Sequence, residues 1–147
     1  MIYQKRIMAL DMGDRRIGIA VSDPMRITAQ GLESYTRKGD EEADLLHICN
    51  VIKENSVELI VCGLPKNMNG TLGPMAEKVQ LFAEKLQEKS GLPLAFEDER
   101  LTTVFAEKLL IEADMRRKDR RKVVDKMAAV AILQGFIDRQ AWTEYLK

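Results

Sequence analysis

The chain has 147 residues, 46% of them hydrophobic, so it is long enough to bury a sizeable core as one domain spanning 1–147. Lys and Arg together number 23, as do Asp and Glu, so the net charge does not indicate a polyanionic partner and only local clusters can. Neither a signal peptide nor an apolar run long enough to span a bilayer is present, which predicts a soluble, cytoplasmic protein without a membrane partner.

The first part of the chain has the pattern of a three-stranded meander. Residues 7–10 and 17–21 are apolar runs separated by a polar corner that contains Gly13, which is typical of a β-hairpin. The first run is apolar on both faces and therefore suits the middle of a sheet. Residues 27–35 can supply the third strand.

Helices and strands then alternate to the end of the chain. The expected elements are a helix beginning at Asp40, a buried strand at 57–62 closed by Gly63, a helix opened by Pro74, a strand at 92–96, a short helix capped by Thr102 and a last helix at 119–139. This β-β-β-α-β-α-β-α-α order predicts an α/β fold in which helices cover both faces of a mixed sheet.

Acidic residues gather where strands are expected to end. Asp11 closes the first strand, Gly63 closes the fourth, and the run Glu97, Asp98, Glu99 follows the fifth. Ligands collect at the carboxyl ends of strands in such sheets, so these positions indicate a candidate site. Taken alone, Asp11 could instead begin a turn. Alternation along a strand also means that Asp98 and Glu99 cannot both face Asp11.

A third acid stands on the last helix. Asp125 is followed by a nearly unbroken apolar stretch at 127–133, in which Ala128 and Ala129 would let the helix lie close to the sheet. Two interpretations are open at this point. Asp125 either completes the acidic site or is an ordinary first-turn acid beside neighbouring lysines.

The residue types available favour a hard metal ion. His47 is the only histidine, and Cys49 and Cys62 lack the spacing of a zinc site and are expected to be reduced core residues. Carboxylates that converge without histidine or cysteine suit Mg²⁺ or Mn²⁺. Such ions activate water and stabilise the leaving oxygen in phosphodiester hydrolysis. The sequence leaves open whether one or two metal ions bind.

Four stretches resemble, in order and spacing, those of the YqgF/RuvX family, small bacterial nucleases of the ribonuclease H-like fold. They are residues 11–23, 63–71, 98–103 and 125–129, and the resemblance covers essentially the whole chain. It implies a five-stranded sheet in the order 3-2-1-4-5 with an antiparallel second strand. It also implies that Asp11, Glu99 and Asp125 are the catalytic, metal-binding acids.

Two positions depart from the patterns of related proteins. The family loop usually has an aspartate where Asn69 stands here, so the turn is kept while one charge is lost. The related RuvC resolvases have a second acid one turn before Asp125, where this chain has Lys122. The strength of a second metal site is therefore in question.

Several polar residues near these acids are candidates for phosphate contacts. In the loop at 63–71, backbone N–H groups, Lys66 and Thr71 could bind phosphate, although the loop could also be a plain strand-to-helix connection. Arg16 and Arg100 each stand close in sequence to a proposed acid. Each either contacts phosphate or pairs with its acidic neighbour.

A basic run precedes Asp125. Residues 116–122 carry six cations and one acid, in a chain that is neutral overall. The run is either a solvated helix entry or the rim of a polyanion-binding site. The arginines proposed to contact substrate are Arg116, Arg117, Arg120 and Arg121.

These features predict a metal-dependent endonuclease that acts on structured nucleic acid, and the family resemblance implies a role in maturation of the small-subunit ribosomal RNA precursor. The same chemistry on branched DNA, as in a Holliday junction resolvase, and a non-catalytic ribosome-assembly module are the alternatives. A kinase or ATPase of the actin-like fold would need a second lobe. The expected partners are precursor rRNA or branched DNA, with the ribosome or its precursors as further candidates, and the chain is expected to be a monomer or homodimer.

Overall fold

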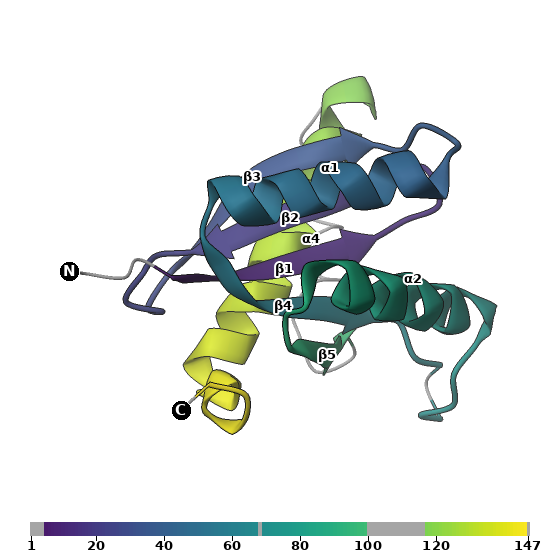
Figure 1. The fold of residues 1–147 in the computed structure, drawn as a ribbon. Coiled ribbons are helices and arrows are strands. Elements are labelled where there is room, and N and C mark those ends of the chain that lie inside the picture. Colours follow the sequence, from purple (N-terminus) through teal and green to yellow (C-terminus); the bar gives the residue numbers. More distant parts are fainter. Residues whose placement is uncertain (1–4, 68, 100–116, 147) are drawn as a thin grey trace.

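The structure, a computed structural model, describes residues 5–67, 69–99 and 117–146, and for residues 117–125 it describes the backbone alone. A five-stranded sheet in the order β3-β2-β1-β4-β5 lies at its centre (Figure 1). The strands are β1 (Arg6–Met12), β2 (Arg16–Ser22), β3 (Ala29–Thr36), β4 (Val57–Leu64) and β5 (Leu94–Asp98). Strand β2 runs antiparallel to both of its neighbours, β1 and β3, whereas β1, β4 and β5 are mutually parallel. The predicted sheet order and antiparallel second strand are confirmed.

Helices cover both faces of this sheet, as expected. The helices are α1 (Glu41–Glu54), α2 (Pro74–Ser90) and α4 (Arg117–Asp138), followed by the short 3-10 helix η2 (Ala141–Glu144). In Figure 1, α1 and α2 lie side by side on one face and α4 crosses the other. The short helix expected from Thr102 falls outside the described residues. No helix in the described ranges has both the length and the hydropathy to cross a membrane.

The central strand β1 is buried on both faces because its side chains alternate between two cores. Met8 and Leu10 belong to the core beneath α1 and α2, whereas Ile7 and Ala9 belong to the core beneath α4. Continuing the alternation places Asp11 on the α4 face. This face also receives Ala128 and Ala129, both buried, which let α4 approach the sheet closely.

The helix boundaries follow from local chemistry. The Asp40 carboxylate accepts a hydrogen bond of 3.1 Å from the Glu42 N–H and so caps α1. Helix α2 has Pro74 at its first position and ends at Gly91, whose φ of 72° is the left-handed conformation that glycine adopts readily. The helix starts at Asp40 and Pro74 match the sequence prediction.

Two strands, β4 and β5, end two residues later than predicted. Strand β4 does not end at Gly63 but continues through it to Leu64. Strand β5 begins at Leu94 and includes Glu97 and Asp98, which pair in register with Gly63 and Leu64. The extension has a physical cause, because pairing with β5 supplies hydrogen-bond partners that a strand ending at residue 62 would lack. Glu97 and Asp98 therefore lie on regular strand rather than in a loop.

Candidate active site

Asp11 lies at the carboxyl end of β1, inside the sheet and on the face covered by α4. It pairs with Gly18 of β2, and the preceding residue, Leu10, pairs with Cys62 of β4. This register places Asp11 beside Gly63. Asp11 is only 8% exposed, so its carboxylate stands at the border of the core, where a charge needs compensation by a polar or cationic partner.

Gly63 creates the space in which a second acid lies. A Cβ atom built on Gly63 would fall 2.8 Å from Oε1 of Glu99 and 2.5 Å from Cδ1 of Ile132 on α4. The Glu99 carboxyl group therefore covers the backbone of Gly63, on the α4 face of the sheet. Asp11 and Glu99 thus reach the same face from β1 and from the end of β5, with Gly63 on the strand between them. This is the orientation the family resemblance implied for Glu99.

The two acids before Glu99 have other contacts. Asp98 points away from the α4 face, and its Oδ2 is 3.9 Å from Nζ of Lys66. Glu97 lies on the α4 face, 2% exposed, and accepts a 2.6 Å hydrogen bond from Nη2 of Arg139 through Oε1. This contact raises the pKa of Arg139. Oε2 of Glu97 is buried, and no donor among the described residues reaches it. The alternation expected from the sequence is therefore observed.

The turn between β1 and β2, residues 13–16, is called the hairpin corner here. The Gly13 N–H donates to the Arg16 carbonyl at 2.9 Å and closes it. A Cβ on Gly13 would meet the same carbonyl oxygen at 2.8 Å, so this position requires glycine. The Arg37 N–H donates to the Arg15 carbonyl at 2.8 Å, and the Arg37 Nη1 donates to the Gly13 carbonyl at 3.1 Å. Arg16 itself is half-buried at the start of β2.

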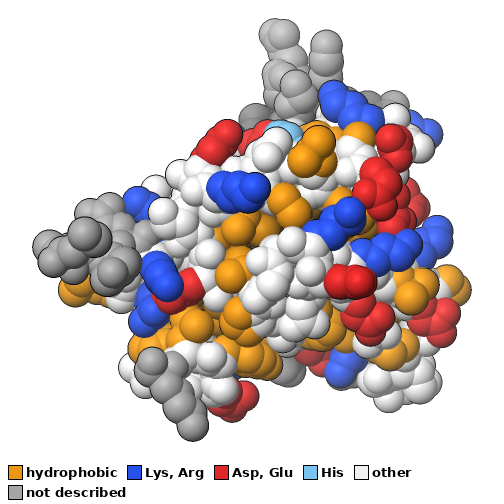
Figure 2. Space-filling view, in the orientation of Figure 1, with side chains coloured by type: hydrophobic (Ala, Val, Ile, Leu, Met, Phe, Trp, Pro, Cys, Tyr) orange, Lys and Arg blue, Asp and Glu red, His pale blue; other side chains and the backbone are white. Residues whose placement is uncertain are grey.

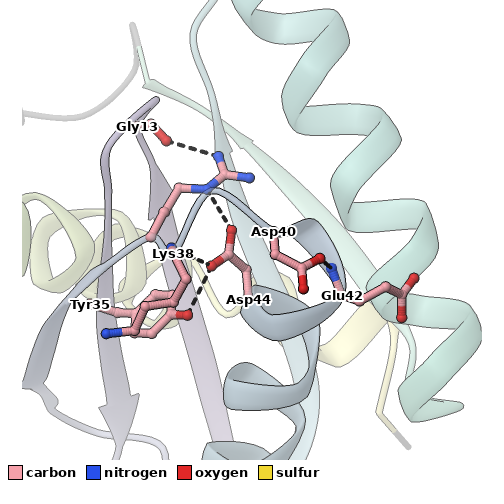
Figure 3. A network of polar contacts seen from close by, with 7 residues as sticks. Gly13, Tyr35, Lys38, Asp40, Glu42 and Asp44 are labelled. Carbon is pink, nitrogen blue, oxygen red and sulfur yellow. Dashed lines mark hydrogen bonds and ion pairs between the residues drawn. The ribbon is translucent and has the colours of Figure 1, made fainter.

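A buried polar cluster supports this corner, and the sequence interpretation did not single it out. Asp44 of α1, 1% exposed, accepts hydrogen bonds from the Tyr35 hydroxyl at 2.8 Å, the Arg37 Nε at 2.9 Å and the Lys38 N–H at 3.2 Å (Figure 3). We call Tyr35, Arg37, Lys38 and Asp44 the Asp44 network. One signal was present in the sequence: Asp44 is four residues before Ile48 and shares the buried stripe of α1 with it.

The Asp44 network has perturbed protonation equilibria. Burial by itself raises the pKa of Asp44, but the hydrogen bonds from Arg37, Tyr35 and the Lys38 N–H outweigh it and hold that pKa below its ordinary value. Burial and the hydrogen bond to Asp44 raise the pKa of Tyr35 to about 12. Asp44 is therefore a carboxylate at neutral pH, and Tyr35 is a neutral donor.

The loop between β4 and α2 is a tight turn held by its own side chains. Oδ1 of Asn69 accepts from the Thr71 N–H at 3.1 Å and from the Thr71 hydroxyl at 2.6 Å. Nδ2 of Asn67 donates to the Thr71 hydroxyl at 3.0 Å, and Gly70 has a φ of 86°. The turn predicted at Asn69 and Gly70 is present. The Thr71 hydroxyl is engaged within the loop, while Lys66 lies at the base of the loop beside Asp98.

Some predicted site residues are not placed by the structure. Arg100 and Arg116 lie outside the described residues. Arg117, Arg120, Arg121 and Asp125 lie on α4, where only the backbone is described. Across the described part of the chain, no group of three or more His, Cys, Asp or Glu residues is arranged to hold a metal ion. The described structure thus places two of the three predicted acids, Asp11 and Glu99, on the same face of the sheet.

The fold is shared with two solved structures of RuvC. RuvC of Thermus thermophilus in complex with a Holliday junction substrate superposes with a TM-score of 0.59 and 13% identity, covering 93% of this chain and 96% of that one. A second structure of the same RuvC gives a TM-score of 0.55 with 12% identity, over 92% and 96% of the two chains. The sheet order and the crossing helix α4 therefore define a ribonuclease H-like protein with acids at its strand ends.

Sequence comparison defines the family more closely. Residues 5–139 match the RuvX family, which is described as Holliday junction resolvase. A relative from Clostridium kluyveri is 54% identical over 134 residues, covering 91% of this chain and 97% of its own. Another from Desulforamulus reducens is 55% identical over 136 residues, with 92% and 98% covered. Both bear the name "Putative pre-16S rRNA nuclease". The chain belongs to the RuvX family.

Proposed function

We propose that this protein is a metal-dependent endonuclease that hydrolyses phosphodiester bonds in structured nucleic acid, with Asp11, Glu99 and Asp125 as its catalytic acids. The proposal is supported by the position of both acids on the α4 face, Asp11 beside Gly63 in the register of β1 and β4 and Glu99 over the Gly63 backbone. Burying carboxylates in such a place is unfavourable unless a cation compensates their charge, and Gly63, near the end of β4, leaves the space for one of them.

The residues at this site fit a hard divalent cation. Asp11 and Glu99 offer carboxylate oxygens only, from elements fixed by the sheet, and oxygen ligands are those that Mg²⁺ and Mn²⁺ prefer. Asp125, on the helix that covers this face, is proposed as the third ligand. When bound there, the metal ion would supply an activated water and compensate the charge that develops on the leaving oxygen.

The remaining polar residues are proposed to bind and orient the substrate. Lys66 stands at the carboxyl end of the sheet, where its ammonium group can contact a phosphate next to the scissile one. Arg16 begins β2, on the side of β1 opposite to β4, and is proposed to contact phosphate there. Thr71 is proposed to act through the backbone of its loop, since its hydroxyl is already hydrogen-bonded to Asn69. Arg100 is proposed to contact phosphate close to Glu99.

The basic run that leads into α4 is the proposed rim of the substrate site. Arg117, Arg120 and Arg121 belong to α4, the helix that covers this side of the sheet, and Arg116 directly precedes that helix in the sequence. The opposite side, formed by α1 and α2, mixes cations and acids on its surface (Figure 2). Several lysines on that side pair with acids, as in Lys85 with Glu41 at 2.5 Å and Lys89 with Glu42 at 2.9 Å. The substrate is therefore proposed to approach the α4 face.

The proposed substrate is the precursor of small-subunit ribosomal RNA, because that is the substrate in the names of relatives more than half identical over nearly the whole chain. Branched DNA is the second candidate, favoured by the family description. The whole range 1–147 is proposed to act as one nuclease domain in the cytoplasm, as a monomer or homodimer, with the ribosome or its precursors as a further partner.

A cleavage panel tests the proposal. Precursor rRNA, Holliday junctions and plain duplexes are incubated with Mg²⁺, with Mn²⁺ or with excess chelator, for the wild-type protein and for Asp11→Asn. Cleavage of precursor rRNA by wild-type protein with metal, and its loss in Asp11→Asn or in chelator, is the expected result. Undiminished cleavage by Asp11→Asn or in chelator would rule out the metal-nuclease proposal. Preferential cleavage of junctions would replace rRNA with branched DNA as the substrate.

A further inference from the structure

We infer that Arg37 and Asp44 are positioning residues for the acidic site, and that they act by holding the hairpin corner to helix α1. The inference rests on the proposed function, because the group to be positioned is the Asp11 carboxylate. Neither residue touches the α4 face. Their effect is transmitted through the backbone between Gly13 and Asp11.

The first step is that Asp44 is fixed. Its side chain accepts three hydrogen bonds, from two side chains and one backbone N–H, and it is 1% exposed. A buried carboxylate with three donors has no alternative arrangement of comparable energy. The Asp44 carboxylate is therefore held in place on α1, and its hydrogen bond with Nε of Arg37 orients the guanidinium group.

The second step is that Arg37 links this point to the hairpin corner. Its Nε donates to Asp44 while its Nη1 donates to the Gly13 carbonyl at 3.1 Å, so one planar group joins α1 to the turn between β1 and β2. The backbone N–H of the same residue donates to the Arg15 carbonyl at 2.8 Å. The Arg37 guanidinium also lies over the Phe82 ring of α2, 5.3 Å from its centroid, which limits its sideways movement.

The third step is that the corner determines where the acidic strand ends. Gly13 is two residues from Asp11, and the register pairs Asp11 with Gly18 and Met12 with Ile17 just before the corner. Strand β1 is buried and paired on both sides, yet its last residues depend on the turn for their position. Catalytic groups must be held to within about 0.5 Å, so a small shift of the corner is enough to displace the Asp11 carboxylate.

Tyr35 provides a matched control within the same network. Tyr35→Phe removes one hydrogen bond to Asp44 but leaves both contacts from Arg37 to the corner. Arg37→Met also removes one side-chain hydrogen bond to Asp44, and in addition it removes the contact with Gly13. Arg37→Lys keeps the charge near Asp44 but lacks the fork that reaches two acceptors, and it serves if Arg37→Met does not fold.

The experiment compares these variants below their melting temperatures, measuring kcat, KM and the Mg²⁺ or Mn²⁺ concentration that gives half-maximal cleavage. For Arg37→Met we expect kcat to fall by up to about 100-fold with a higher metal requirement and little change in KM, since the misplaced group is Asp11. For Tyr35→Phe we expect both values to stay within about twofold of wild type, apart from a lower melting temperature. A kcat and metal requirement in the Arg37 variants that match those of Tyr35→Phe would overturn the inference.

Amide hydrogen exchange separates this inference from the proposed function, because it needs no activity. The Gly13 N–H, hydrogen-bonded across the corner, should exchange faster in the Arg37 variants than in Tyr35→Phe, by at least about tenfold if the corner opens. If the Gly13 N–H exchanges faster in the Arg37 variants but the wild-type protein cleaves no substrate, Arg37 does hold the hairpin corner and the proposed nuclease function is wrong. Unchanged exchange would reject the positioning, whatever the activity.

Discussion

The carboxyl group of Glu99 lies against the backbone of Gly63, so close that a Cβ on Gly63 would fall 2.8 Å from Glu99 Oε1. Gly63 is an interior residue of β4, a position where glycine usually weakens a strand. Its backbone is not in the left-handed region, so the requirement for glycine comes from space alone. The absence of a side chain at Gly63 leaves the space in which the Glu99 carboxyl group lies between β4 and α4.

Gly63→Ala should therefore damage the site more than the fold. The added methyl group must displace Glu99 and also Ile132, whose Cδ1 would be 2.5 Å away, and overpacking of this kind costs about 1 to 3 kcal/mol of stability. We expect the cleavage rate of Gly63→Ala to fall by more than the decrease in its folded fraction can account for. Activity is to be measured well below the melting temperature of the variant.

Gly31→Ala is the matched control for this substitution. Gly31 is also a strand residue beneath α4, but its added Cβ would meet the Lys126 Cβ at 3.4 Å, an ordinary contact. We expect near wild-type activity and stability in Gly31→Ala. Equal loss of activity in the two variants would mean that the packing of α4, rather than the position of Glu99, is what Gly63 protects.

The two neighbouring acids of β5 should differ in their importance for cleavage. Glu99→Gln keeps the size of a side chain on the α4 face and removes its charge, so it should abolish metal-dependent cleavage. Asp98→Asn removes a charge on the other side of the strand and weakens the 3.9 Å ion pair with Lys66, so it should lower the rate slightly. The measurement is kcat at saturating metal for both variants. A larger fall in kcat for Asp98→Asn would exchange the roles proposed for the two acids.

The basic run should contribute affinity that depends on salt. Changing Arg116, Arg117, Arg120 and Arg121 together to Ala should weaken nucleic-acid binding. The slope of log K against log salt should become shallower by about 0.7 to 0.9 for each phosphate that these arginines no longer neutralise. The rate at saturating substrate should change much less. Binding is to be measured by titration at several salt concentrations.

The lysines of α2 supply a control for the basic run. Lys78, Lys85 and Lys89 lie on the opposite side of the sheet and each is paired with an acid. Changing these three to Ala should leave the salt slope unchanged. If the two multiple variants lower the slope equally, the substrate contacts both sides of the molecule; if neither lowers it, the basic run is a solvated surface.

Acid should destabilise the protein partly through Asp44. The pKa of Asp44 is lower in the folded protein than the ordinary 3.8, so the unfolded chain binds this proton more readily. The resulting stability is fully present above about pH 4 and is lost as the pH falls through the folded pKa. Asp44→Asn should cost about 1.5 to 3 kcal/mol at neutral pH, and less in acid.

Urea unfolding of wild type and Asp44→Asn from about pH 7 down to pH 3 checks this expectation. The difference in unfolding free energy should shrink in the acidic part of the range. A difference that stays constant across the range would show that the missing hydrogen bonds, and not the ionisation of Asp44, account for the effect of the substitution.

The amino-acid sequence by itself determined the elements whose signals are local. The hairpin around Gly13, the cap at Asp40, the first turn at Pro74 and the end of α2 at Gly91 all depend on residues within a few positions of each other. The order of the sheet followed from the family resemblance, which combines several such stretches. Asp11 was found from its place after a buried apolar run, whereas the choice of Glu99 over Asp98 came from the family resemblance.

Only the tertiary structure decided which groups meet. Gly63 reads as a strand terminator in the sequence, yet pairing with β5 carries the strand through it and leaves room for Glu99. Glu97 is held by Arg139, which is 42 residues away in the sequence, and Asp44 joins α1 to the corner beside Asp11. Local patterns cannot encode such contacts, because the side chain that meets a buried charge is selected by strand register and helix packing, which depend on the whole chain.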